Sequence, residues 1–308
     1  MARRRRGKII SGWLAVDKPL EITSSTVVNQ VRRLLDAAKA GHGGTLDPLA
    51  TGVLPIAFGE ATKTVAYVMD GSKSYRVTLK FGEARSTDDA EGEVVATSDH
   101  RPSPAEIEAV LGEFTGEIQQ VPPKFSAIKV NGKRAYDLAR RDEDVVLKAR
   151  PILIKDLRLV DMPDRDHAVF DVISGKGAYM RSLARDIALR LGSVGHISAL
   201  RRTSAGPFAE GDSIPLQTLL EMDPEAVMEK LLPVETALDD IPALALTEVE
   251  AQRLASGQPV GLLAVAKRSD LGTPVAQDGI VCAMLNDRAV ALAEIHGGEI
   301  RPVRVFNL

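Results

Sequence analysis

The sequence lacks three features that would place it in a specialised class of protein. It has a single cysteine, Cys282, so no disulfide can form within the chain, which is typical of a reducing cytosol. It has no run of about 18 or more apolar residues, which argues against a membrane-spanning helix. Its N-terminus lacks the apolar core and cleavage site of a secretory signal. We therefore expect a cytoplasmic protein without membrane association.

The few histidines are too scattered to predict a metal site. Neither with one another nor with the cysteine do they show the spacing of zinc ligands. They are His42, His100, His167, His196 and His296. The rest of the composition is ordinary, because 44% of the 308 residues are hydrophobic and 26% are charged. This length suits one large domain or two unequal ones.

The net charge of −3 hides an uneven distribution. Residues 1–210 hold 32 Lys+Arg against 27 Asp+Glu, whereas residues 211–308 hold 7 against 15. Basic residues cluster within residues 1–8, which carry five positive charges, and within residues 124–150, which carry eight against four acids. Such patches can face a phosphate backbone, although charge runs are also common on solvated surfaces.

Hydrophobic periodicity predicts an α+β fold with a mixed, largely antiparallel sheet. Strands and helices mix without the regular spacing of βαβ units, which argues against a Rossmann-type fold. Strands are expected at residues 12–16, 53–58, 75–81, 152–160 and 168–174. Helices are expected from near Ser24 or Ser25, from about Thr62, and over residues 102–114 and 178–191.

Five prolines between residues 207 and 242 indicate a domain boundary. We predict a basic tail at residues 1–10, a large domain at 11–210 with an insertion at about 122–150, a helical connector at 211–242 and a small module at 243–308. In that module, Thr247 and Glu250 form a capping box, and short strands are expected near residues 280–285, 289–295 and 303–306.

Two local motifs could carry chemistry. The first is the glycine-rich stretch Gly41-His-Gly-Gly-Thr-Leu-Asp-Pro-Leu-Ala-Thr-Gly-Val-Leu-Pro55. It is neither a P-loop nor a dinucleotide fingerprint, and a plain tight loop closed by Asp47 is one interpretation. The second is the acidic stretch Thr87–Glu93, which lacks the ligand pattern of an EF-hand and which we interpret as a solvated turn.

The first motif resembles the signature of the TruB family of pseudouridine synthases, which modify uridine 55 of tRNA. Further stretches resemble family motifs in the same order along residues 10–208: Val16-Asp-Lys-Pro19, Gly59-Glu-Ala-Thr-Lys63, Lys73-Ser-Tyr75, Pro122-Pro-Lys-Phe-Ser-Ala-Ile-Lys129, Lys176-Gly-Ala-Tyr-Met-Arg181 and Leu200-Arg-Arg202. Two positions depart from the pattern, since Gly43 and Phe125 stand where relatives often carry threonine and tyrosine.

The resemblance implies roles for eight residues. The catalytic set is Asp47 as the reacting carboxylate, Arg181 as its partner and Tyr75 as the platform for the base. The substrate-binding set is Lys18, His42, Lys129, Tyr179 and Leu200. Taken singly, each of these side chains would instead be interpreted as a loop, surface or packing residue. The small module resembles a PUA-like domain.

The resemblance implies isomerisation of uridine in the T-loop of tRNA by base flipping, with a secondary role in tRNA folding. The reaction involves no redox change or net group transfer, so we expect no cofactor and no metal. A carboxylate could attack C1′ or take a proton from C2′, and the sequence leaves both routes open. We expect tRNA, through its T-arm, as the partner of a monomer without an obligate protein partner.

Three alternatives stay open. A protein that only binds or folds RNA would not need an aspartate beside an arginine. A glycosidase-like hydrolase would need a second carboxylic acid, for which the sequence offers no compelling candidate. A guide-RNA-dependent rRNA enzyme is the third, against which the insertion and the basic N-terminus count.

Overall fold

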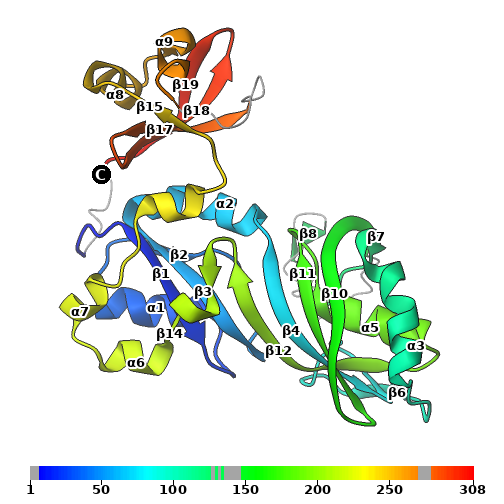
Figure 1. The fold of residues 1–308 in the computed structure, drawn as a ribbon. Coiled ribbons are helices and arrows are strands. Elements are labelled where there is room, and N and C mark those ends of the chain that lie inside the picture. Colours follow the sequence, from blue (N-terminus) through cyan, green and yellow to red (C-terminus); the bar gives the residue numbers. More distant parts are fainter. Residues whose placement is uncertain (1–6, 126–128, 131–132, 135–146, 270–278) are drawn as a thin grey trace.

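The computed structural model describes residues 7–125, 129–130, 133–134, 147–269 and 279–308, with only the backbone described at residues 129–130 and 133–134. A large domain built on one curved sheet carries a small β-rich C-terminal domain at one end (Figure 1). Among these residues, no helix has the length and apolar character needed to cross a membrane.

The large sheet is mixed and mainly antiparallel, as predicted. Its strands lie in the order β14 (Ile214–Pro215), β1 (Gly12–Lys18), β3 (Ala50–Phe58), β12 (Gly195–Ala205), β4 (Lys73–Phe81), β11 (His167–Ser174), β10 (Arg150–Asp164) and β7 (Gly116–Gln120). Two short strands join it, β2 (Ala40–His42) beside β3 and β13 (Phe208–Ala209) beside β12. Only the β1–β14 and β3–β12 pairs are parallel.

One face of this sheet holds the main core. On β4 the odd-numbered residues Val77, Leu79 and Phe81 are buried, as strict alternation predicts, and Tyr75 packs against them. The same core takes up apolar residues of five helices: α1 (Ser24–Leu34), α3 (Pro104–Leu111), α5 (Met180–Arg190), α6 (Leu216–Glu221) and α7 (Pro224–Met228). These helices therefore cover the face of the sheet to which Tyr75 belongs.

The other face carries a second core that joins the two domains. Trp13 is fully buried there, with its ring centroid 5.2 Å from that of Phe208. Leu292 and Phe306 of the small domain pack into the same cluster, as does Cys282, whose thiol pKa burial raises to about 12. A cysteine so buried and so weakly acidic is a packing residue and not a nucleophile.

Helices and short strands complete both domains. In the large domain, α2 (Val65–Asp70) follows a 3₁₀ turn at Gly59–Lys63, so the helix expected from about Thr62 starts later than predicted. The chain between the domains forms α6 (Leu216–Glu221) and α7 (Pro224–Met228). Two hairpins are β5 (Glu83–Arg85) with β6 (Val94–Thr97) and β8 (Lys129–Val130) with β9 (Lys133–Arg134).

The small domain has a sheet in the order β15 (Ala243–Ala245), β17 (Ile280–Leu285), β18 (Arg288–His296), β19 (Glu299–Val305) and β16 (Val260–Gly261). Its helices are α8 (Glu248–Ala255) and α9 (Leu262–Ala266). The predicted capping box of Thr247 and Glu250 starts α8, which confirms that local prediction. The N-cap of α1, by contrast, is Thr23 and not Ser24 or Ser25.

Candidate active site

Asp47 lies in the loop between β2 and β3, and this loop is anchored through its backbone. Ser24, at the start of α1, donates from Oγ to the Leu46 carbonyl and accepts from the Leu46 amide, both at 2.8 Å. The Asp47 carbonyl accepts from the Ala50 amide at 3.0 Å. The Asp47 side chain is 38% exposed. The loop therefore presents a carboxylate to solvent from a fixed position.

Arg181, in the first turn of α5, pairs with this carboxylate. Its Nη2 lies 2.9 Å from Asp47 Oδ2 and its Nη1 lies 3.3 Å from Asp89 Oδ2. The guanidinium also donates to the carbonyls of Thr87 and Phe125. Because only 7% of the Arg181 side chain is exposed, a permanent positive charge is held between one open and one buried carboxylate.

Asp89 corrects one prediction of the sequence analysis. The stretch Thr87–Glu93 was expected to be a solvated turn, but Asp89 is buried and carries the second ion pair of Arg181. Its neighbour Asp88 lies 2.8 Å from Arg185, and burial raises the pKa of Asp88 against the opposing charge of that arginine. The turn is held inward because two α5 arginines supply the charges that compensate its burial.

Lys18, at the end of β1, is fully buried and binds the loop that carries Asp47. Its Nζ donates to the carbonyls of Pro19 and Ile22 at 2.8 Å and of Pro48 at 3.2 Å. Burial lowers the pKa of Lys18 to about 8, while Asp47 opposes the shift. Lys18 thus holds the residue that follows Asp47 and adds a positive charge near it.

Tyr75 is half-buried on β4, directly opposite Arg202 of β12. The Arg202 guanidinium hydrogen-bonds the Tyr75 side chain and donates to the carbonyls of Val53 at 2.7 Å and Gly44 at 3.1 Å. Burial lowers the pKa of Arg202. One buried cation therefore links the tyrosine to both ends of the loop that carries Asp47.

This close approach requires glycine at position 52. Gly52 has φ +100°, and a Cβ there would stand 2.2 Å from the carbonyl oxygen of Arg202. Any side chain would force β3 and β12 apart beside the loop that carries Asp47. The glycines of the motif therefore serve the packing of the strands as well as the turn itself.

The other predicted site residues lie around this centre. His42 is in β2, its Nδ1 is buried without a partner among the described residues, and burial lowers its pKa. Leu200 is buried in β12, opposite Ala50 and Val77. Tyr179 precedes α5 and is half-buried. The side chain of Lys129 lies outside the described residues.

The structure thus brings Asp47 and Arg181 into direct contact, with Lys18 and the Tyr75–Arg202 pair beside the same loop. Sequence reasoning missed two buried members of this group, Asp89 and Arg202. Arg202 stood within the quoted Leu200-Arg-Arg202 motif, which was a signal for it. A part-exposed carboxylate fixed beside a guanidinium can act as a nucleophile or a general base.

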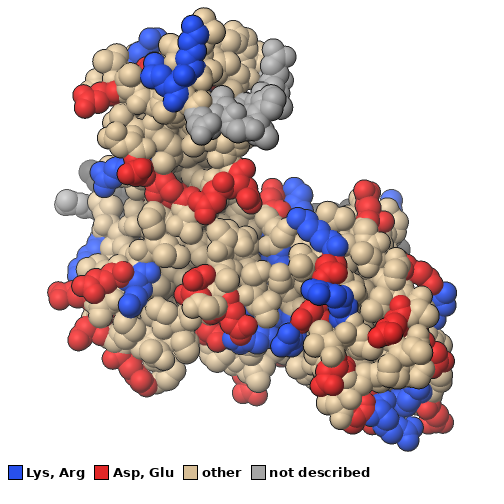
Figure 2. All heavy atoms as spheres, viewed as in Figure 1, with Lys and Arg blue, Asp and Glu red and all other residues tan. Residues whose placement is uncertain are grey.

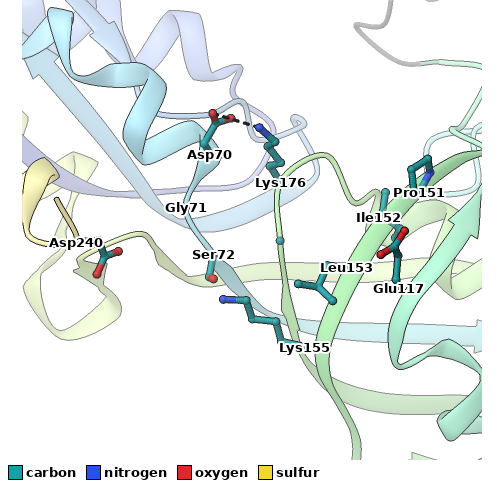
Figure 3. A pocket seen from close by; sticks show the side chains of 11 residues that line it. Asp70, Gly71, Ser72, Glu117, Pro151, Ile152, Leu153, Lys155, Lys176 and Asp240 are labelled. Atoms are coloured by element: carbon teal, nitrogen blue, oxygen red, sulfur yellow. Dashed lines mark ion pairs between the residues drawn. The ribbon is translucent and has the colours of Figure 1, made fainter. Parts of the chain in front are cut away.

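An open groove of about 530 Å³ lies elsewhere, near the Asp70–Lys176 ion pair (Figure 3). Leu153 and Lys155 line it and alternate with the buried Ile152, so they project from the opposite face to the main core. None of the predicted site residues whose side chains are described lines this groove. On the face shown in Figure 2, acidic side chains gather between the domains and the large domain mixes both signs of charge. The groove thus shares no residue with the Asp47 centre.

Comparisons with known proteins assign the chain to known families over most of its length. Residues 32–180 match the model described as TruB family pseudouridylate synthase (N terminal domain). Residues 181–239 match the tRNA pseudouridylate synthase B C-terminal domain. The tRNA pseudouridine synthase B of Rhodospirillum rubrum is 60% identical over 309 residues, covering 100% of both chains. That of Caulobacter vibrioides is 52% identical over 309 residues, with the same coverage.

Solved structures share the fold. A chain of the archaeal box H/ACA sRNP Nop10–Cbf5 complex matches with a TM-score of 0.75 at 25% identity, covering 96% of this chain and 86% of that one. A chain of an H/ACA RNP bound to a substrate RNA containing 2′-deoxyuridine matches with a TM-score of 0.77 at 24% identity, covering 100% and 92%. These matches extend through both domains.

Proposed function

The chain belongs to the TruB family of pseudouridylate synthases, and from this premise we propose that it isomerises uridine 55 in the T-loop of tRNA with Asp47 as the catalytic carboxylate. The protein is a tRNA-modifying enzyme that converts uridine to pseudouridine, as its relatives along the full chain indicate. The target site and the role of Asp47 are the parts that we propose.

The observation that carries this proposal is the Asp47–Arg181 pair, with its 2.9 Å separation and its part-exposed carboxylate. Pseudouridine formation breaks the N1–C1′ bond, turns the uracil and joins C5 to C1′, after which the C5 proton leaves. Asp47 can reach a ribose from its loop, either to attack C1′ or to take a proton from C2′. Both routes start from the ionised carboxylate, beside which Arg181 keeps its charge.

Base flipping explains the aromatic and apolar residues around the pair. Extruding a base from its stack costs a few kcal/mol. Stacking on an aromatic ring returns about 1–3 kcal/mol per base, and Tyr75 offers that ring. We propose that Leu200, Tyr179 and Lys18 surround the flipped uracil. His42 and Lys129 would then contact the T-loop outside the pocket.

The test uses the purified protein alone with an unmodified tRNA transcript that carries tritium at uridine C5. We expect tritium release from one T-loop position and its loss, by about 10³-fold or more, in Asp47→Asn. Asp171→Asn is the matched control, since Asp171 is an equally exposed aspartate paired with an arginine on the other face of the sheet. Release at another position, or full activity of Asp47→Asn, would overturn the proposal.

The assay with purified protein, together with a test of Asp47→Asn in cells, separates the alternatives. Free uracil in the supernatant would indicate a glycosidase-like hydrolase. Retained cellular function of Asp47→Asn would indicate that RNA binding or folding is the main role. Activity that appears only after a guide RNA is added would indicate a guide-dependent enzyme, whereas we expect the protein to act without one.

A further inference from the structure

The end of β7 makes an unusual set of contacts with the start of α5. Gln120 is the last residue of β7 and is 1% exposed, although its side chain is polar. Its partner across the ladder is Arg150, the first residue of β10. The predicted insertion, at about 122–150, begins just after Gln120 and ends at Arg150. Gln120 therefore stands at the base of the insertion and faces inward.

The Gln120 amide binds the backbone of Tyr179 in both directions. Its Oε1 accepts from the Tyr179 amide at 2.8 Å, and its Nε2 donates to the Tyr179 carbonyl at 3.1 Å. Tyr179 is the N-cap residue of α5, and no side chain caps the helix from that position. Arg150 adds a second contact, with its Cζ 5.2 Å from the centroid of the Tyr179 ring.

The residues after Gln120 hold the first turn of α5 as well. The Val121 carbonyl accepts from Ser182 Oγ at 2.8 Å. The Phe125 carbonyl accepts from Arg181 Nη2 at 3.0 Å, and this is the nitrogen that lies 2.9 Å from Asp47 Oδ2. The segment that begins at Gln120 thus binds three groups at the start of α5: the backbone of Tyr179, the guanidinium of Arg181 and the hydroxyl of Ser182.

The buried Gln120 amide needs hydrogen-bond partners, and this need favours its contact with Tyr179. A buried glutamine that lost its partners would leave an amide unpaired, and such a loss is unfavourable. The carbonyl of Tyr179 also accepts a hydrogen bond from the Leu183 amide, at 3.0 Å, which is the first bond of the helical pattern. The amide of Tyr179 depends on Gln120 alone among the described contacts. The accepting Oε1 is therefore the more important half of the clamp.

We propose that Gln120 is a positioning residue for the isomerisation: by fixing Tyr179 it sets the first turn of α5 and hence the place of Arg181 beside Asp47. This inference rests on the proposed function of that pair. Gln120 has no described contact with Asp47 or Asp89, and it reaches the predicted site only through the Tyr179 backbone, so it acts through the helix. Its loss should slow the chemical step more than it weakens the binding of tRNA.

The experiment compares Gln120→Met with Gln119→Met, its exposed neighbour on the same strand. Methionine has nearly the volume of glutamine but cannot bond the Tyr179 backbone. We expect the single-turnover rate of pseudouridine formation to fall about tenfold or more in Gln120→Met, with the Kd for tRNA changed less than threefold. Gln119→Met should match the wild type in both quantities.

Gln120→Glu tests the accepting half of the clamp, and it decides the matter if Gln120→Met does not fold. Glutamate keeps an oxygen for the Tyr179 amide, so its rate should lie above that of Gln120→Met and less than tenfold below that of the wild type. Three outcomes would overturn the positioning role. Gln120→Met could be as fast as Gln119→Met, or it could lose only tRNA binding. Gln120→Glu could have a rate tenfold or more below that of the wild type. An inactive wild type would instead overturn the proposed function itself.

Discussion

Two arginine–aspartate pairs of the large domain have the same N–O distance and similarly exposed carboxylates, but their arginines have different surroundings. Arg181–Asp47 and Arg76–Asp171 both have N–O distances of 2.9 Å, and their carboxylates are 38% and 37% exposed. The arginines differ, since the Arg181 side chain is 7% exposed and that of Arg76 is 54% exposed. Neither the N–O distance nor the exposed fraction of the aspartate therefore distinguishes the Asp47 site from the Arg76–Asp171 pair.

What distinguishes the proposed catalytic pair is therefore the surroundings of its arginine. Arg76 makes two hydrogen bonds, both to Asp171, and an exposed pair of this kind contributes about 0–1 kcal/mol to stability. Arg181 also binds a buried carboxylate and two backbone carbonyls, so its position is fixed from several sides. Substitutions in each pair test whether this difference between the two arginines governs activity and stability.

The largest effect is expected from Arg181→Met. Without the guanidinium, Asp47 loses the charge beside it and Asp89 is left buried without its arginine. We expect the single-turnover rate to fall about 10²–10³-fold. The free energy of unfolding should fall by about 3–5 kcal/mol, because a buried charge has lost its partner. Tritium release and urea unfolding measure the two. A rate within tenfold of the wild type would contradict this account.

A smaller effect is expected from Asp89→Asn. The amide keeps the shape of the carboxylate but removes the second charge that holds Arg181, which still retains Asp47 and both carbonyls. The free energy of unfolding should fall by about 1–3 kcal/mol. The single-turnover rate should fall about tenfold. Asp99→Asn, at an exposed aspartate, serves as the control and should change neither quantity.

The buried lysines of the same face extend the comparison to pH. Burial lowers the pKa of Lys18 and of Lys73 to about 8, from 10.5 for a free lysine. Below pH 8 both lysines are protonated in the folded and unfolded states. Between pH 8 and pH 10.5 the unfolded chain binds more protons, so their contribution makes the free energy of unfolding rise with pH.

Lys73→Met should therefore flatten this rise relative to the wild type. Urea unfolding at several pH values across the window measures the difference between the two slopes. Lys73 donates to the carbonyls of Met69 and Gly71, so the variant is also expected to be less stable below pH 8. If the free energy of unfolding rises with pH equally in the variant and the wild type, the lowered pKa of Lys73 does not cause the rise.

The smallest effect is expected from Arg76→Met on the open face. The free energy of unfolding should change by less than about 1 kcal/mol. Pseudouridine formation should be unchanged, since Arg76 points away from the face that Tyr75 shares with the core. A loss of activity similar to that of Arg181→Met would remove the distinction between the two pairs.

Much of the fold could be predicted because its signals are local. The alternation on β4, the helical period of α5 and the capping box of α8 each depend on residues close in sequence. Strand β12 carried no such signal, and two register shifts against β4 interrupt its pattern. The order of the strands could not be predicted from periodicity, because it depends on pairings between residues far apart in the chain.

The candidate site was predictable where a motif marked it. The resemblance named Asp47 and Arg181, and the fold brings them together. It gave no reason to single out Asp89, because a run of acids looks the same in sequence whether it is solvated or folded onto two arginines. Gln120 was missed for a similar reason. Its neighbour Gln119 is the same residue type but is exposed, and only the pairing of β7 in the sheet shows which of the two faces inward.

The bonds that Lys18 and Arg202 make to the loop that carries Asp47 have a consequence for how the protein tolerates mutation. Both cations donate hydrogen bonds to main-chain carbonyls, Lys18 to that of Pro48 and Arg202 to that of Gly44. Every amino acid supplies the same oxygen, so the anchoring does not depend on which side chain a loop position bears. Exposed Thr45 should accept many replacements without displacing its neighbour Asp47. Substitution at this exposed position is thus compatible with an unchanged placement of Asp47, whereas Gly44, with φ +132°, disfavours any side chain.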